Sequence, residues 1–120
     1  MLRVLLVALL CSPLLASAAE PAYPSKPVRL IVPYPAGGAN DTFARPVAKK
    51  LSEVLGQQFV VDNRAGASGV IGVSLVKAAT PDGYTLLVTS GSLYLIPLTL
   101  KDAPFDPVKD LTPIDRKSVV

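Results

Sequence analysis

Three short stretches carry the residues that could do chemistry in this chain, and all three are rich in small or polar residue types. In chain order these residues are Tyr34, Gly37, Gly38, Ala39, Asn40, Asp41 and Thr42; Gly66, Ala67, Ser68 and Gly69; and Ser90, Gly91 and Ser92. Each stretch follows an apolar run, and a helical pattern follows the first two. Backbone N–H groups are unpaired where a helix begins, and the helix dipole adds positive charge. These stretches therefore favour the binding of a carboxylate or a phosphate.

The spacing of the glycines does not name that anion. Residues 66–72 have the form G-x-x-G-x-x-G, which differs from the dinucleotide-binding pattern G-x-G-x-x-G. The sequence also lacks the phosphate-binding pattern G-x-x-x-x-G-K-[ST]. The residues support an anion site without specifying its ligand.

Catalysis is poorly supported by the residue types present. The chain contains no His and a single Cys, Cys11. A serine hydrolase using Ser90 or Ser92 is the alternative function, but it would lack a His base and the G-x-S-x-G turn. The residue types therefore disfavour a Ser-His pair and a His-based metal site.

The first 18 residues have the layout of a secretory signal peptide. A short basic start, Met1 to Arg3, precedes the apolar run Val4 to Leu15 and the small residues Ala16 to Ala18. The run is shorter than the roughly 20 residues that a membrane-spanning helix needs. We predict cleavage after Ala18 or Ala19. An exported chain without disulfides fits a bacterial periplasm.

Charge gives little indication of a partner. The formal net charge is +3, and removal of Arg3 leaves 11 basic against 9 acidic residues. No basic stripe with interleaved aromatic residues is present, so nucleic-acid binding is not expected.

The remaining sequence alternates between strand and helix patterns. Residues 19–27 are rich in proline and predict an extended arm. Apolar, β-branched runs at 28–32, 58–62 and 84–89 predict strands, and a second helix is expected from about 69 to 79. The order is βαβαβ with short connections, which favours an α/β fold built on one parallel sheet. The three polar stretches would then meet at the carboxyl edge of that sheet, where ligands bind in such folds.

The first helix is predicted between the first polar stretch and Gly56, a left-handed terminator. Asn40, Asp41 or Thr42 could cap its start, and Pro46 should bend it or leave one carbonyl unpaired. The residues expected on its buried face are Phe43, Val47, Leu51, Val54 and Leu55. For the second helix they are Val70, Ile71, Leu75 and Ala78.

The pattern weakens after Leu93. Pro97 interrupts any helix there, and residues 102–113 are interpreted as a surface connection. Residues 115–120 follow without a pattern that predicts packing, and they are interpreted as an atypical, possibly non-native tail.

Five ordered blocks resemble the periplasmic Bug-type receptors of tripartite tricarboxylate transporters. They are residues 23–38 (YPSKPVRLIVPYPAGG), D-x-x-A-R at 41–45, N-R-x-G-A with Gly69 from residue 63, PDGYTLL at 81–87 and D-P-x-K-D at 106–110. The similarity extends from about Tyr23 to Ile114. It implies that residues 28–114 are part of the N-terminal lobe of a type II Venus-flytrap fold, and that this fold is incomplete here.

The resemblance also implies a function and a site. Receptors of this type capture a small organic carboxylate and deliver it to membrane permease subunits. They are not enzymes, and we expect a monomer that needs no metal or cofactor. Carried onto this chain, the three polar stretches would be its ligand loops. Asp41 would repel a carboxylate unless it points elsewhere, so a capping role is favoured. Arg64 could pair with the ligand, but an Arg at a strand end more often braces neighbouring loops.

The chain departs from the family in length, since such receptors have roughly 300 residues. The resemblance then implies one wall of a clamp whose other wall lies outside this sequence. Weak independent binding is expected, and an inert fragment is a further alternative.

Overall fold

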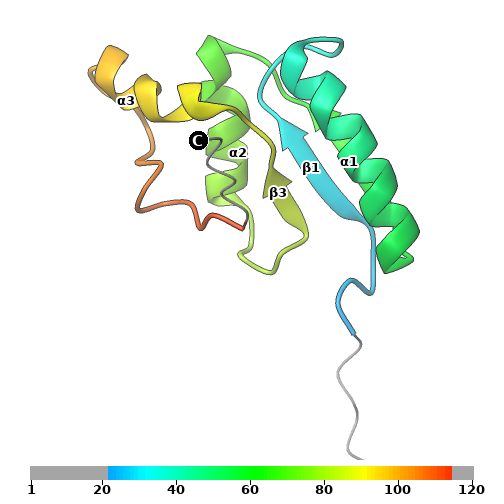
Figure 1. Ribbon diagram of the computed structural model, residues 1–120. Helices are drawn as coiled ribbons and strands as arrows, with labels where there is room; N and C mark the ends of the chain where they lie inside the picture. The colour runs from blue at the N-terminus through cyan, green and yellow to red at the C-terminus, as the bar shows by residue number, and fades with distance from the viewer. Residues whose placement is uncertain (1–21, 115–120) are drawn as a thin grey trace, which may run out of the picture.

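The computed structural model describes residues 22–114, so the predicted signal peptide and the residues after Ile114 lie outside the described part. The elements alternate as β1 (Val28–Val32), α1 (Ala39–Leu55), β2 (Phe59–Asn63), the short turn η1 (Ala67–Gly69), α2 (Val70–Ala78) and β3 (Thr85–Leu87). The 3₁₀ helix η2 (Gly91–Leu95) and α3 (Ile96–Thr99) follow (Figure 1). No helix in residues 22–114 is long and apolar enough to cross a membrane.

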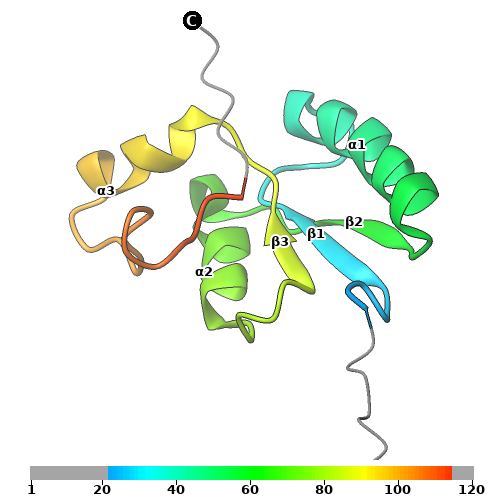
Figure 2. The ribbon, with the colours of Figure 1, turned by 60° about the horizontal axis from the view of Figure 1, so that its bottom comes forward.

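The three strands form one parallel sheet in the order β2-β1-β3, as the βαβαβ pattern predicts (Figure 2). β1 is central, with Val28 opposite Phe59 and Leu30 opposite both Val61 and Leu86. Because the strands are parallel, the segments that follow all three leave from the same edge of the sheet. The α/β fold class is therefore confirmed.

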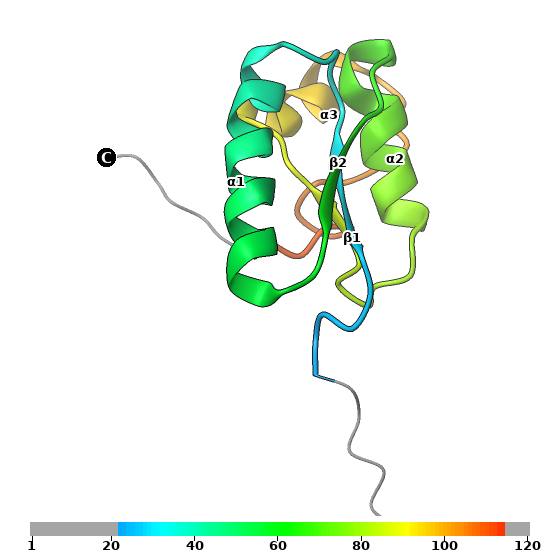
Figure 3. The ribbon, with the colours of Figure 1, turned by 90° about the vertical axis from the view of Figure 1, so that its right-hand side faces the viewer.

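The helices cover opposite faces of the sheet, with α1 on one side and α2 on the other (Figure 3). One apolar cluster lies under α1 and contains Val28, Leu30, Ala48 and Phe59. A second cluster lies around α2 and contains Val73, Leu93, Ile96 and Phe105. A central strand with helices on both faces is buried on both faces, which explains why four of the five residues of β1 are buried.

Helix α1 begins two residues earlier than a side-chain cap at Asn40 would place it. Gly38 occupies the N-cap position, no side chain caps it, and the N–H of Thr42 donates to its carbonyl at 2.9 Å. The predicted C-terminal signal is confirmed, because Gly56 is left-handed with φ of 70°. Pro46 lies inside α1, which continues to Leu55.

The predicted buried face of α1 is wrong in part. The buried residues are Asp41, Ala44 and Ala48, whereas Phe43 and Val54 are 65% and 66% exposed. Small alanines let α1 approach the sheet closely, so they occupy the contact that larger side chains were expected to fill. In α2 the buried residues are likewise Gly72 and Val73, while Ile71 is exposed.

The segment after Leu93 is more ordered than its sequence suggests. Pro97 lies in the first turn of α3, where the missing N–H costs nothing, so it opens a helix instead of preventing one. Residues 102–113 are not merely a surface connection, because Phe105 is only 4% exposed and packs beside Val73. Lys77 holds this segment to α2 by pairing with Asp110 at 2.8 Å.

Candidate functional site

The three predicted stretches lie together at the carboxyl edge of the sheet. Tyr34, in the loop after β1, meets Ser92, which follows β3, with a hydroxyl–hydroxyl distance of 2.8 Å. Gly69, at the start of α2, is also adjacent, because a methyl group placed on it would lie 3.6 Å from the Tyr34 hydroxyl. Segments 58 residues apart in sequence thus share one surface, and Tyr34 lies where they meet.

A short chain of hydroxyl groups links the first stretch to the third. The Ser92 hydroxyl contacts Tyr34 on one side and the Ser90 hydroxyl, also at 2.8 Å, on the other. Each hydroxyl can donate or accept, so this chain can reorient to offer either a donor or an acceptor to a ligand. Within the described residues, these bonds pair the two serines with each other and with Tyr34 and not with a base. A hydrolytic serine would need a base as its partner.

The first stretch offers free backbone donors where α1 begins. Within residues 22–114, no acceptor is found for the N–H groups of Ala39, Asn40 or Asp41. The Gly37 N–H is not free, since it donates to the Asp41 carboxylate at 2.8 Å. The donors available to an anion are therefore those of the first turn of α1, reinforced by the helix dipole.

The second and third stretches present further donors. Gly66, Ala67, Ser68 and Gly69 all have φ between 45° and 139°, a conformation that costs about 1 kcal/mol or more for Ala and Ser. Strain of this kind is concentrated at functional sites. The N–H groups of Ala67 and Ser68, and those of Gly91 and Ser92, also find no acceptor in the described residues.

Asp41 is buried and held by the protein. One of its oxygens accepts from Gly37 N and from Arg45 Nε at 2.9 Å, and the other accepts from Asn63 Nδ2 at 3.0 Å. These bonds, the one from Arg45 foremost, lower the pKa of Asp41 to about 2. Asp41 does stabilise the helix start, but from inside the first turn and by reaching back to Gly37. The sequence places Asp41 among the predicted ligand residues, whereas in the structure both of its oxygens already have protein donors.

Arg64 forms an ion pair at the end of β2. It pairs with Asp62 at 2.8 Å, and Arg29 pairs with the same carboxylate at 2.6 Å. Hydrogen bonds from Arg29 and Arg64 lower the pKa of Asp62. In this structure Arg64 thus pairs within its own strand end, and its contact with a ligand stays a prediction.

Sequence reasoning missed two residues that belong to the site. Asn63 ends β2 and donates both to Asp41 and to the Tyr34 carbonyl, and nothing in its local sequence signals this. Arg45 follows Asp41 at the i,i+4 spacing of a helical ion pair, a signal that could have been read.

Thr89, just after β3, has a buried hydroxyl without a partner among the described residues, which is uncommon in a folded protein.

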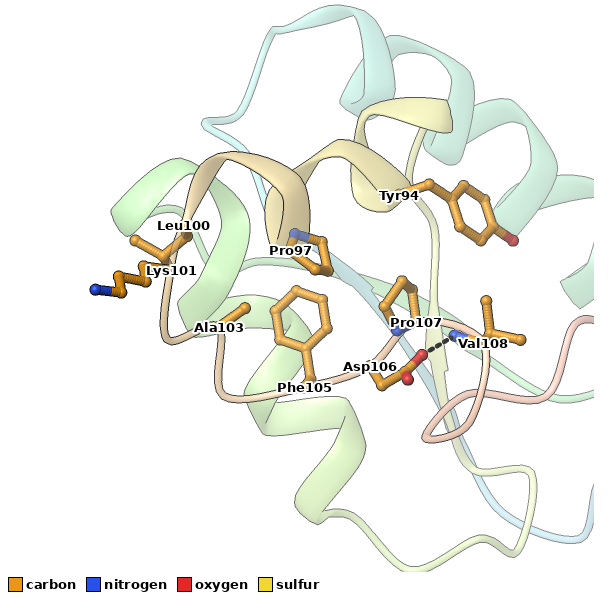
Figure 4. A pocket seen from close by; sticks show the side chains of 9 residues that line it. All are labelled: Tyr94, Pro97, Leu100, Lys101, Ala103, Phe105, Asp106, Pro107 and Val108. Atoms are coloured by element: carbon orange, nitrogen blue, oxygen red, sulfur yellow. Dashed lines mark hydrogen bonds between the residues drawn. The ribbon is translucent and has the colours of Figure 1, made fainter.

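One hollow is lined by residues outside these three loops. It has a volume of about 390 Å³ and is bounded by α3 and the connection that follows it, with Tyr94, Phe105 and Val108 among its lining residues (Figure 4). The three loops themselves are largely open, since Pro35 to Ala39 are exposed. No group of three or more His, Cys, Asp or Glu in residues 22–114 could hold a metal ion.

Known proteins resemble this chain in sequence and fold. The pattern of the family described as "Tripartite tricarboxylate transporter family receptor" matches residues 43–119. A UPF0065 protein of Bordetella bronchiseptica is 46% identical over 112 residues, which are 88% of this chain and 33% of that protein. The chain thus spans about a third of the length of the curated relatives it matches.

Solved structures of periplasmic proteins also resemble this chain. One described as a periplasmic transporter is 48% identical with a TM-score of 0.71, covering 73% of this chain and 30% of the other. The protein MatC of Rhodopseudomonas palustris, solved with bound malate, is 32% identical with a TM-score of 0.66, covering 77% of this chain and 32% of the other. The family match extends over more than half of the sequence. The chain belongs to the tripartite tricarboxylate transporter receptor family.

Proposed function

We propose that this chain forms one wall of a binding site for a small organic carboxylate in a periplasmic solute receptor. The observation that carries the proposal is the meeting of three loops at Tyr34, each with N–H groups that find no acceptor within residues 22–114. An ionised carboxylate can only accept hydrogen bonds, so its site must supply several donors that point toward it. That is the chemistry these loops offer.

The ligand contacts in this proposal are mainly backbone contacts. The N–H groups of Ala39 and Asn40 would meet one carboxylate, with Ser68 and Ser92 contributing from the neighbouring loops. Gly37 and Asp41, both among the predicted ligand residues, would support the loop instead of touching the ligand. The remaining small residues of the three stretches, such as Gly38 and Gly91, have no bulky side chain, so a ligand can approach the backbone closely.

The likeness to the malate-bound relative supports a dicarboxylate as the ligand class. The family description supports delivery of the captured solute to membrane permease subunits, and it supports a periplasmic location reached through the predicted signal peptide. Residues 28–114 would then contribute to the N-terminal lobe of the receptor.

The proposal is tested by ligand-dependent stabilisation of the chain. Malate at about ten times its dissociation constant should add about 1.4 kcal/mol to stability and raise the melting temperature by roughly 6–10 °C. The matched control is the neutral diamide of malate, which has the same skeleton without the charges and should give no shift. Equal shifts from both compounds would contradict carboxylate recognition.

The serine-hydrolase alternative is separated in the same preparation. Turnover of an activated ester that is lost in Ser90→Ala or Ser92→Ala would favour it. Stabilisation by malate without turnover would favour the receptor.

A further inference from the structure

Three side chains close a hydrogen-bonded ring behind the proposed ligand loops. Arg45 Nε donates to Asp41 at 2.9 Å, and Arg45 also donates from its terminal nitrogen to Asn63 Oδ1 at 3.3 Å. Asn63 Nδ2 completes the ring by donating to the other Asp41 oxygen at 3.0 Å. Every polar group of Asp41 and Asn63 side chains is therefore used inside the protein.

The ring also holds the backbone of the first loop at two points. Asp41 accepts from Gly37 N, and Asn63 Nδ2 donates to the Tyr34 carbonyl at 3.2 Å. Tyr34 is the residue whose hydroxyl meets Ser92. Asn63 ends β2 and leads directly into the segment that carries Ser68. The ring thus ties the first loop to the origin of the second.

The charges in the ring matter because the proposed ligand is an anion. Asp41 lies in the first turn of α1, beside the free N–H groups, and its pKa of about 2 keeps it ionised near neutral pH. An ionised carboxylate at that position opposes anion binding at the same helix start. Arg45, directly paired with Asp41, is placed to cancel this charge.

We propose that Asp41, Arg45 and Asn63 form a positioning triad that fixes the first loop against the second, and that Arg45 neutralises Asp41 beside the ligand. This proposal rests on the proposed function for its second part. None of the three side chains contacts the carboxylate; they determine where the donors of Ala39 and Asn40 lie and what potential the ligand meets.

The charge role is tested by a rescue experiment. Arg45→Gln leaves Asp41 uncompensated and should weaken malate binding about tenfold at low ionic strength, measured by amide chemical-shift titration. Adding Asp41→Asn removes the remaining charge and should restore affinity to within about threefold of the parent. A double variant as weak as Arg45→Gln alone would overturn the charge role, because a purely structural loss cannot be rescued by a second truncation of the ring.

The positioning role is tested without ligand. The Gly37 amide should exchange its hydrogen at least tenfold more slowly than an unstructured peptide, because it donates to Asp41. Asp41→Ala should remove this protection, whereas Asp41→Asn, which keeps an acceptor oxygen, should retain most of it. Unprotected exchange at Gly37 in the parent chain would overturn the triad.

The two experiments also separate this inference from the proposed function. If the parent chain binds no carboxylate, the receptor proposal and the charge role both fail. The exchange of Gly37 in the parent and in Asp41→Ala then decides the positioning role alone.

Discussion

Gly72 lets α2 lie directly against Pro33, the residue after β1, and replacing it with alanine is a stringent test of the packing that brings the loops together. A methyl group at Gly72 would lie 2.7 Å from Pro33 Cβ, 2.8 Å from Pro33 Cα and 2.9 Å from the Arg64 carbonyl oxygen. Carbon atoms normally approach to about 3.5 Å. The helix must therefore move by nearly 1 Å, since two of the three neighbours are backbone atoms.

Two effects oppose each other in Gly72→Ala. Alanine favours a helix over glycine by about 1 kcal/mol. Overpacking against rigid neighbours costs about 1–3 kcal/mol, and contacts this short with backbone belong at the upper end. We expect a net destabilisation of about 2 kcal/mol, which lowers the melting temperature by roughly 8–16 °C for a domain of this size.

The assay is thermal unfolding followed by circular dichroism. Gly91→Ala is the matched control, because it makes the same chemical change at a position with no atom within 4 Å of the added methyl. It should change stability by no more than about 0.5 kcal/mol. A Gly72→Ala variant as stable as the parent would refute the close contact between α2 and Pro33, and with it the spacing of the first two loops.

Three further changes test other parts of the structure by simple measurements. Ile31 is fully buried, so Ile31→Ala should lower the free energy of unfolding by about 2–5 kcal/mol, measured by thermal or urea unfolding. Val60 is 48% exposed, so Val60→Ala should lower it far less. Similar losses would contradict the central place of β1. The pKa of the Asp41 carboxyl is about 2 in the folded chain, against an ordinary value of 3.8. The stabilisation that this carboxylate provides is therefore present above about pH 4 and is lost as the pH falls toward 2. The melting temperature of Asp41→Asn should depend less on pH in that range than that of the parent, and an unchanged dependence would contradict the hydrogen-bond network around Asp41. Lys77→Met should lower the free energy of unfolding by less than about 1 kcal/mol. It should speed amide hydrogen exchange at Asp110, because the ion pair that holds this residue to α2 is lost. Unchanged exchange would contradict the role of Lys77 in holding this segment.

The elements that the sequence predicts best are those with a strong local signal. The first strand, Val28–Val32, is predicted to the residue, because its apolar, β-branched run is bounded by Pro27 and Pro33. Gly56 is correctly placed as a left-handed helix end. In both cases the local preference and the tertiary environment favour the same structure.

The errors arise where packing decides. The buried face of α1 is turned toward Ala44 and Ala48 and away from Phe43, and hydrophobicity alone cannot indicate that close approach selects small residues. Phe105 lies in a proline-rich stretch without periodicity, yet it fills the cluster beside Val73. Burial of this kind depends on contacts between distant segments, which a single sequence does not display.

Sheet topology predicts the candidate site better than any single motif does. Parallel strands bring the three stretches to one edge, and the contact between Tyr34 and Ser92 agrees with that expectation. Sequence could not show which N–H groups are already used. The Gly37 amide is taken by Asp41, and the role of Asn63 emerges only when β2 lies beside β1.

The central claim is that backbone N–H groups of three loops bind one carboxylate, and a titration with malate followed by amide NMR shifts tests it most directly. We expect the amides of Ala39, Asn40, Ser68 and Ser92 to shift together with one dissociation constant, which should be weak because the loops are open. Gly56 and Gly83, which lie at the opposite edge of the sheet, should not move. No shift in the three loops, or equal shifts at both edges, would contradict the account.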